Sequence, residues 1–244
     1  GGHADLLNKT DLIELHHKHF DPCSQRPQFQ VKDSILENLL NDDVTGGVDR
    51  DAYVCINGVY HGAVVMNTIP QMTVSGMMAS MSLLRFKEYS IALKVRPINR
   101  EYLGEHEERG IERRERAFRA NGKSSLASTI ENMRTRVKRL LKGDSIPFHV
   151  QFIVHCWAES PETLTERLSC VAQEIQMLNG AKAYILDVPT SCRNAFFNTV
   201  PASGYWDDLG KHYLEDSNLA HLVPLCSGDG KLDTHNEVLF NAAN

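Results

Sequence analysis

One segment limits the possible folds of this chain more than any other. Residues 147–158 (PFHVQFIVHCWA) alternate in character, which predicts a β-strand with one apolar face. A helix is expected next, because Ser160-Pro161-Glu162 supplies an N-cap, a first-turn proline and an early acidic residue. Residues 181–188 then predict another strand. We expect the apolar face of the first strand to carry Phe148, Val150, Phe152, Val154 and Cys156, and the inner face of the helix to carry Leu164, Leu168, Val171, Ala172, Ile175 and Leu178.

The same order of elements occurs earlier in the chain. Residues 51–69 are rich in β-branched and aromatic side chains and predict two strands, or one bent strand. Residues 75–86 predict a helix with Ser75 as its cap, and residues 89–96 alternate as a half-buried strand that Pro97 ends. Two split β-α-β units predict a ferredoxin-like core of class α/β (α+β), with helices packed on one face of the sheet.

A long charged segment interrupts this core. Residues 100–119 are dense in charge, and their acidic and basic side chains are spaced four apart, which is typical of an exposed helix. Residues 126–141 have an amphipathic helical pattern. Together they predict a protruding helical hairpin joined at Asn121-Gly122. The pairs expected along its first helix are Glu105–Arg109, Glu112–Arg116 and Glu115–Arg119.

The predicted elements divide the chain into two parts. Residues 1–50 are expected to be a helical and irregular segment, with helical patterns at 4–20 and 31–41. Residues 51–240 are expected to form one α/β domain with the helical excursion at 100–142. A further helix is predicted at 190–199.

The bulk properties exclude some classes of protein. The 244 residues are 42% hydrophobic and 23% charged, which is typical of a globular chain rather than a disordered one. The net charge of −5 argues against general nucleic-acid binding, which needs clustered Lys and Arg. The sequence contains neither an apolar run of bilayer length nor the pattern of a signal peptide. Six scattered cysteines without CxxC spacing indicate a reducing, cytosolic compartment.

Two fragments resemble parts of a nucleotide site. Gly122-Lys123-Ser124 matches the end of a phosphate loop, but Ala117 stands where the first glycine belongs and a charged helix precedes it. We therefore interpret the fragment as a hairpin tip. Tyr184-Ile185-Leu186-Asp187 has the form of a strand that ends in a Mg²⁺-binding Asp, and we interpret it as a strand closed by a turn-forming Asp.

Several titratable residues are candidates for a functional site. His16, His17 and His19 lie close together, and the first and last would share a helix face, but two imidazoles are a weak metal signal and solvated side chains are predicted. His149 and His155 would lie on the strand face opposite the core residues and could act as bases, although no recognisable nucleophile motif accompanies them. Asp207-Asp208 is interpreted as the start of a surface helix.

A basic run lies on the second hairpin helix. It is expected to pair with glutamates of the first helix or to form a solvated face, and contact with nucleic acid or anionic lipid is the alternative. The run comprises Arg134, Arg136, Lys138, Arg139 and Lys142.

From the residues alone we assign no catalytic, cofactor or metal site.

The second half of the chain carries short motifs in a distinctive order. FIVHCWAESPETLTERLSCVAQEI is followed by AFFNTVPASGYW, an aromatic-rich segment that reaches the pair Val200-Pro201. DSNLAHLVPLCSG comes next and has Ser217, Ala220 and Pro224 in a Ser-x-x-Ala-x-x-x-Pro pattern. In this order, residues 150–240 resemble the N-terminal domain of the CagE/TrbE family of ATPases. These ATPases serve bacterial type IV secretion and conjugation.

The resemblance implies a role in docking and self-assembly. Family members are cytoplasmic, hexameric motors peripherally associated with the inner membrane, and their C-terminal domain binds ATP and Mg²⁺. The resemblance implies that this ATPase domain lies outside the present chain, that no cofactor binds here, and that the parent protein forms a homo-oligomer. Its expected partners are inner-membrane and other ATPase components of the machine. Two alternatives stay open, namely a small metal- or His-dependent enzyme and a nucleic-acid-binding module that uses the 126–142 helix.

Overall fold

The protein is described from a computed structural model of residues 1–244. The structure describes residues 9–23, 44–45, 52–70, 72–121, 124–201, 204 and 206–223, so the helical pattern predicted at 31–41 lies outside the described residues. The described strands are β1 (Val44–Thr45), β2 (Val54–Ile56), β3 (Val59–Thr68), β4 (Tyr89–Pro97), β5 (Pro147–Ala158), β6 (Lys182–Ile185) and β7 (Lys211–Glu215). The helices are α1 (Lys9–Phe20), the 3₁₀ helix η1 (Met77–Leu83), α3 (Arg100–Asn121), α4 (Ser124–Lys142), α5 (Pro161–Met177), α6 (Pro189–Thr199) and α7 (Asp216–Leu222).

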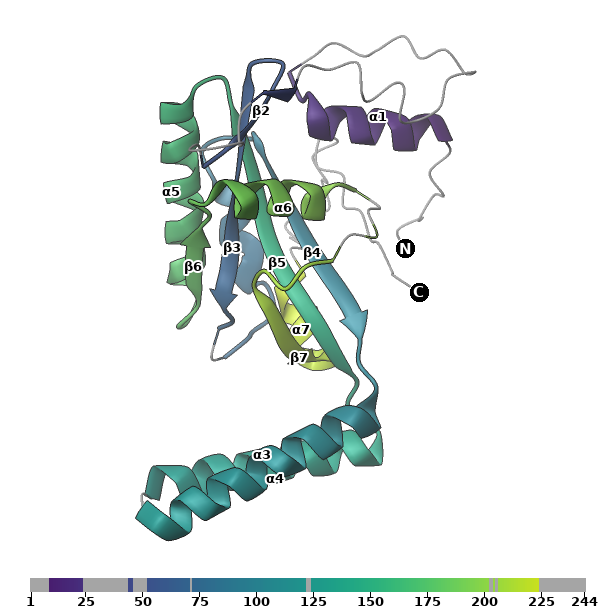
Figure 1. Cartoon of the computed structure of the whole chain (residues 1–244), viewed down its shortest axis with the longest axis vertical. Helices are drawn as coiled ribbons and strands as arrows, with labels where there is room; N and C mark the ends of the chain where they lie inside the picture. Colours follow the sequence, from purple (N-terminus) through teal and green to yellow (C-terminus); the bar gives the residue numbers. More distant parts are fainter. Residues whose placement is uncertain are drawn as a thin grey trace.

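The strands form one antiparallel sheet at the centre of the molecule (Figure 1). Its main path runs β1-β2-β3-β5-β4, while β6 pairs with β3 and β7 pairs with β5. Strands β6, β3, β5 and β4 therefore lie side by side with helices η1 and α5 in their crossovers. This is the strand order of two split β-α-β units, so the predicted ferredoxin-like core is confirmed.

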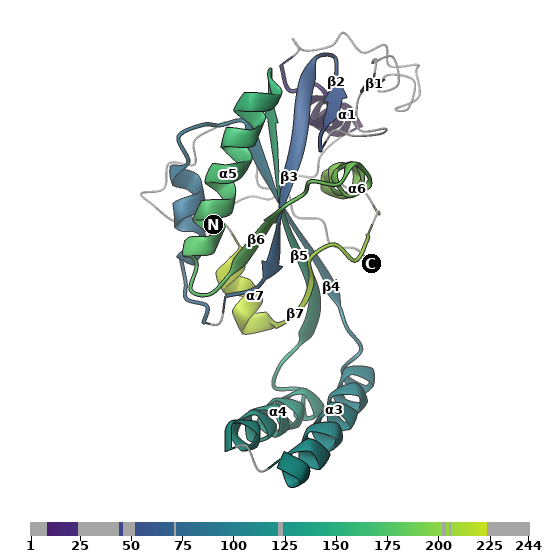
Figure 2. The same cartoon turned by 60° about the vertical axis from the view of Figure 1, so that its left-hand side comes forward.

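Helices cover both faces of the sheet, so the prediction of helices on one face is wrong. Figure 2 shows α5 and α7 on one side of the strands and α6 and α1 on the other. The reason is that β3 and β5 are apolar on both sides: Val64 and Phe152 enter one core, while Val65 and Ile153 enter the other. Helices α5, η1 and α7 pack on the first core, and α6 packs on the second.

Helix α5 has the predicted start and packs closely on the sheet. The Ser160 hydroxyl accepts a hydrogen bond from the Thr163 N–H at 3.2 Å, and Pro161 occupies the first turn. A Cβ at Gly62 of β3 would lie 2.9 Å from Leu168 Cδ1, so the absence of a side chain there permits the close approach of the helix. All six apolar residues predicted for its inner face are buried: Leu164, Leu168, Val171, Ala172, Ile175 and Leu178.

The segment predicted as a helix at 75–86 is a short 3₁₀ helix instead. Gly76 rather than Ser75 occupies the N-cap, in a left-handed conformation (φ 75°), and no side chain caps the helix. Met78 and Met81 are fully buried, and the Tyr89 hydroxyl donates a 2.7 Å hydrogen bond to the Met81 carbonyl. Burial of these side chains against α5 and α7 therefore decides the backbone form here.

Helices α3 and α4 form the predicted hairpin and project from one end of the sheet (Figures 1 and 2). We call this pair the arm, and the sheet with its covering helices the body. A narrow apolar seam of Ile111, Ile130 and Val137 joins the two arm helices. The three predicted ion pairs are confirmed, with N–O distances of 3.5, 3.7 and 3.9 Å: Glu105–Arg109, Glu112–Arg116 and Glu115–Arg119. No helix among the described ranges has the length and apolarity to cross a bilayer.

Candidate docking site at the base of the helical hairpin

The arm joins the body where α4 leads into β5. Gly143, with φ +82°, turns the chain directly after α4. Strand β7 pairs with the first residues of β5, which places Tyr213 and Glu215 of β7 next to the last turns of α4. The predicted hairpin therefore meets a strand that lies about 70 residues further along the chain.

Glu215 fastens the arm to the body. The residue is only 6% exposed, and its carboxylate accepts hydrogen bonds from Arg139 of α4 and from the Ser145 hydroxyl, the latter at 2.9 Å. A buried carboxylate requires such partners, because its desolvation is otherwise unfavourable. The contact thus links the last turn of α4 to strand β7.

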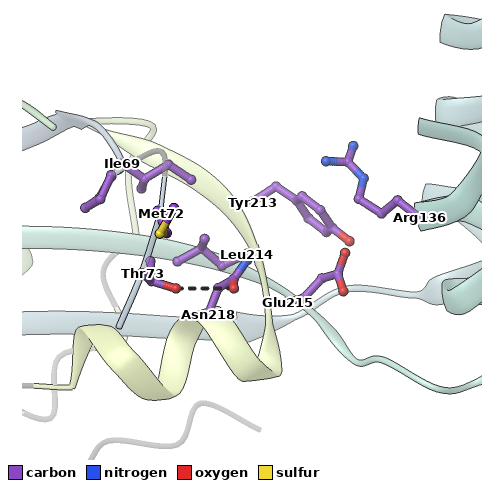
Figure 3. Close-up of a pocket in the computed structure, with 9 residues that line it drawn as sticks. Ile69, Met72, Thr73, Arg136, Tyr213, Leu214, Glu215 and Asn218 are labelled. Carbon is purple, nitrogen blue, oxygen red and sulfur yellow. Dashed lines mark hydrogen bonds between the residues drawn. The ribbon is translucent and has the colours of Figure 1, made fainter. Parts of the chain in front are cut away.

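Arg136 makes a second link across the junction. Its guanidinium forms an ion pair with Glu107 of α3 and lies 5.0 Å from the ring centre of Tyr213. Burial raises the pKa of Tyr213 to about 12, with Arg136 opposing that shift, so the phenol is protonated at neutral pH. Figure 3 shows the Arg136 side chain reaching from the arm toward the Tyr213 ring.

A pocket of about 360 Å³ lies at this junction (Figure 3). We call it the junction pocket. On its far side, the Thr73 hydroxyl donates a 3.3 Å hydrogen bond to the Asn218 side chain. Two buried polar atoms of lining residues, the Tyr213 hydroxyl oxygen and Arg136 Nε, have no hydrogen-bond partner among the described residues. The lining residues are Ile69, Pro70, Met72, Thr73, Arg136, Tyr213, Leu214, Glu215 and Asn218.

Apolar side chains are exposed at and beside the pocket. Met72 lines it and is 65% exposed, and Val74 follows in the same loop. Ile146 is exposed as well, and its carbonyl accepts a hydrogen bond from the Asp216 N–H directly after Glu215. Exposed apolar groups gathered around a pocket are typical of a surface that binds another protein.

The predicted solvated histidines are partly buried, which corrects that prediction. His19 is only 8% exposed and packs against His155 and Phe196, with ring centroids 4.8 and 4.9 Å away. His16 also makes a contact, through Nε2, with the Pro201 carbonyl at 2.6 Å. The prediction of solvated side chains was wrong because α1 packs across the second face of the sheet. A histidine ring there packs against aromatic rings instead of lying in water.

Sequence reasoning missed His61, which completes this histidine cluster. His61 of β3 stacks on His155 of β5, and the two rings hydrogen-bond at 3.0 Å. Burial lowers the pKa of His19 to about 4 and that of His61 to about 3, and it lowers the pKa of His155 well below 6.5. The three imidazoles are therefore neutral at pH 7 and pack as core side chains. The pairing of β3 with β5 brings His61 and His155 together, and the packing of α1 on the sheet adds His19, so no motif within one segment could have found the cluster.

The other candidates lie apart from the histidine cluster. His149 is half-buried near the start of β5, before His155 in the strand. Asp207 starts a tight turn rather than the predicted surface helix: its carboxylate accepts hydrogen bonds from the Leu209 N–H at 3.0 Å and from the side chains of Gln151 and Asn198, both at 3.1 Å. Asn198 also accepts from Lys94, at 2.6 Å. This buried polar network holds the segment before β7 on the sheet.

The basic run of α4 forms the predicted pairs within the hairpin. Arg134 binds Glu115 at 2.5 Å, and Arg136 binds Glu107. Arg139 instead reaches the body, which the sequence did not predict.

The structure describes only part of the two nucleotide-site fragments. Gly122 and Lys123 lie outside the described residues. Asp187 accepts a 2.6 Å hydrogen bond from the Tyr184 hydroxyl, after the short strand β6. Within the described ranges, no group of three or more His, Cys, Asp or Glu side chains is arranged to hold a metal ion.

Comparison of the chain with known proteins adds no assignment. No model of a protein family matches the sequence, and no curated protein matches it.

Proposed function

We propose that this chain is a docking domain, and that it forms the N-terminal part of an ATPase of type IV secretion or conjugation. In this proposal the domain attaches the motor to the inner-membrane complex and takes part in its assembly. The family assignment rests on the ordered motifs of residues 150–240. The docking role rests on the junction pocket.

The junction pocket is the observation that carries the proposal. Arm and body are joined there by Glu215 and Arg136, so the surface presented by both parts has a fixed shape. A preformed surface binds a partner without the cost of ordering two mobile parts. Apolar side chains are exposed at its edge, and Tyr213 and Arg136 are among the residues that line it.

The exposed apolar side chains indicate the chemistry of the partner segment. Met72 is 65% exposed and Val74 is 55% exposed. A segment with one or two apolar side chains would cover both and remove them from water. We propose such a segment from a membrane-complex subunit as the occupant.

Site-specific cross-linking tests this role. A photoreactive amino acid replaces Met72 in the full-length protein in its own cells, and the same probe at Gln173, exposed on α5, serves as the matched control. We expect position 72 to cross-link to an integral membrane subunit of the transfer machine, and position 173 to give no such product. Equal labelling from both positions, or no membrane subunit at position 72, contradicts the docking role.

Nucleotide binding tests the family assignment separately. We expect the 244-residue chain to bind no ATP at micromolar concentrations, whereas a longer chain that includes the following domain hydrolyses ATP with Mg²⁺. Micromolar ATP affinity of the 244-residue chain would argue against the assignment. Cross-linking at the pocket without ATPase activity in the longer protein would leave a docking domain of another family.

A charge imbalance supports a second candidate, binding of nucleic acid by the arm. Residues 100–142 contain 12 Lys and Arg against seven Asp and Glu, a net charge of +5, while the remaining residues contain 14 and 24, a net charge of −10. Five of the arginines are paired with glutamates within the arm, however. Binding of a DNA duplex that weakens with salt and is lost in an Arg134→Ala plus Arg136→Ala variant would favour this candidate over docking.

A further inference from the structure

Strand β4 is the longest strand at an edge of the sheet. It has nine residues and pairs with β5 along its whole length, whereas β1, β6 and β7 have two, four and five residues. No described strand pairs with the other side of β4, which forms the right-hand border of the sheet in Figure 1. Proteins normally keep such edges short or interrupt them, because unpaired backbone groups bind a further strand.

The register shows which backbone groups face away from the sheet. The Trp157 N–H donates to the Glu88 carbonyl at 3.2 Å, and the Ile98 N–H donates to the Pro147 carbonyl at 3.0 Å. Hydrogen-bonded residues alternate along an antiparallel ladder, so the even-numbered residues of β4 bond to β5. Ile91, Leu93 and Val95 therefore direct their N–H and C=O groups outward.

The charged side chains of β4 do not shield this edge. Lys94 donates to Asn198 of α6 at 2.6 Å, and the Arg96 guanidinium lies 5.0 Å from the ring centre of Trp206. Both side chains are thus directed across the second face of the sheet. On the first face, Ile91 and Leu93 pack only partly buried against the core. An added strand would complete both their burial and the hydrogen bonding of the edge.

We propose that a second copy of this chain supplies that strand, with the two β4 strands antiparallel about a two-fold axis at Leu93. In this register Ile91 lies opposite the partner's Val95, which gives a continuous apolar row on one face. On the other face Lys94 lies opposite the partner's Ala92, and Arg96 lies opposite the partner's Ser90. No cation faces a cation, whereas an axis at Lys94 would place two lysines opposite each other.

The pairing leaves the junction pocket free. The arm leaves the sheet directly after β4, and antiparallel pairing therefore directs the two arms to opposite ends of the joined sheet. Each copy would retain its own docking surface. The dimer rests on the β4 edge alone and does not depend on the proposed docking function.

A proline variant tests the pairing. In Val95→Pro the outward N–H is removed while the bonds to β5 remain, and Pro97 shows that β4 accommodates a proline at a position of the same orientation. Val95→Thr is the matched control, because it keeps the N–H and the β-branched shape. In sedimentation velocity we expect dimers of the wild-type chain and of Val95→Thr, and monomers of Val95→Pro with unchanged circular dichroism.

Amide exchange of the wild-type chain provides a test without any substitution. We expect the amides of Ile91, Leu93 and Val95 to become protected as the chain concentration rises through the dimerisation range, while those of Ala92 and Lys94 are protected throughout. A chain that stays monomeric at high micromolar concentration overturns the proposal. So does a dimer whose outward amides show no concentration dependence, or one that persists in a folded Val95→Pro variant.

Discussion

The body and the arm of this protein are held together by different forces. In the body, β3 and β5 are buried on both faces, and side chains such as Phe152 and Ile153 have no contact with solvent. In the arm, one narrow seam of three buried residues joins α3 and α4, and exposed ion pairs line the rest. Two-sided burial gives rigidity, whereas short-range pairs let a helical hairpin extend away from the core. The candidate docking site lies where these two regions meet.

The largest expected effect is on the body core. Phe152→Ala removes a ring that is 1% exposed and should lower the free energy of unfolding by about 3–5 kcal/mol. The matched variant in the arm, Ile130→Ala, should lower the free energy of unfolding by about 2 kcal/mol. This is at the low end for such truncations, because the apolar seam between the two arm helices is narrow. Urea denaturation measures both. Equal losses in the two variants would contradict the contrast between body and arm.

Acidification should weaken the body before the arm. His19 has a folded-state pKa of about 4 against 6.5 when unfolded, so the unfolded chain takes up the proton first as the pH falls. The contribution of neutral His19 to the free energy of unfolding is therefore fully present above about pH 6.5 and is lost toward pH 4. For His19 alone this loss is about 3 kcal/mol. His19→Gln should flatten this dependence, and His106→Gln, on the exposed face of the arm, should not. An unchanged pH profile in His19→Gln would refute the buried, neutral state of the cluster.

A smaller effect is expected at the junction. Glu215→Gln removes the charge that Arg139 contacts but keeps an acceptor for Ser145, and should cost about 1–2 kcal/mol because Arg139 is half exposed. The distance between spin labels on arm and body should become more widely distributed. Glu131→Gln, an exposed residue of α4, is the control. A narrow distance distribution in Glu215→Gln would show that Glu215 does not fix the arm.

The smallest effect is expected on the arm surface. Glu112→Gln breaks one exposed ion pair with Arg116 and should change the free energy of unfolding by less than about 0.5 kcal/mol. The same change should become undetectable at high salt, because exposed pairs are screened. Thermal unfolding at low and high ionic strength measures it. A loss above about 1 kcal/mol would mean that surface pairs stabilise the arm more than its seam does.

Local patterns predicted most of the elements because their causes are local. The alternation of 147–158, the Ser160 cap and the charge spacing of 100–119 each act within a few residues, and each led to the observed element. The failures have long-range causes. The second covered face, the 3₁₀ form of 77–83 and the turn at Asp207 depend on contacts with distant segments.

The candidate docking site could not be predicted from the sequence for the same reason. Arg136 and Arg139 belong to a recognisable basic run, but their partners Tyr213 and Glu215 lie about 75 residues away. The histidine cluster likewise joins three distant segments, namely two strands that pair in the sheet and helix α1, which packs on it. No pattern within one segment encodes such pairs.

By itself, the sequence determined the class of the fold and the presence of a charged helical arm, because hydrophobic periodicity and helix pairing act over short distances. Only the tertiary structure decided what each titratable group does. Packing of α1 and α6 on the sheet made the histidines neutral core residues, and the position of β7 gave Arg139 a buried carboxylate as its partner. Protonation and pairing depend on burial and distance, and both are set only when remote segments meet.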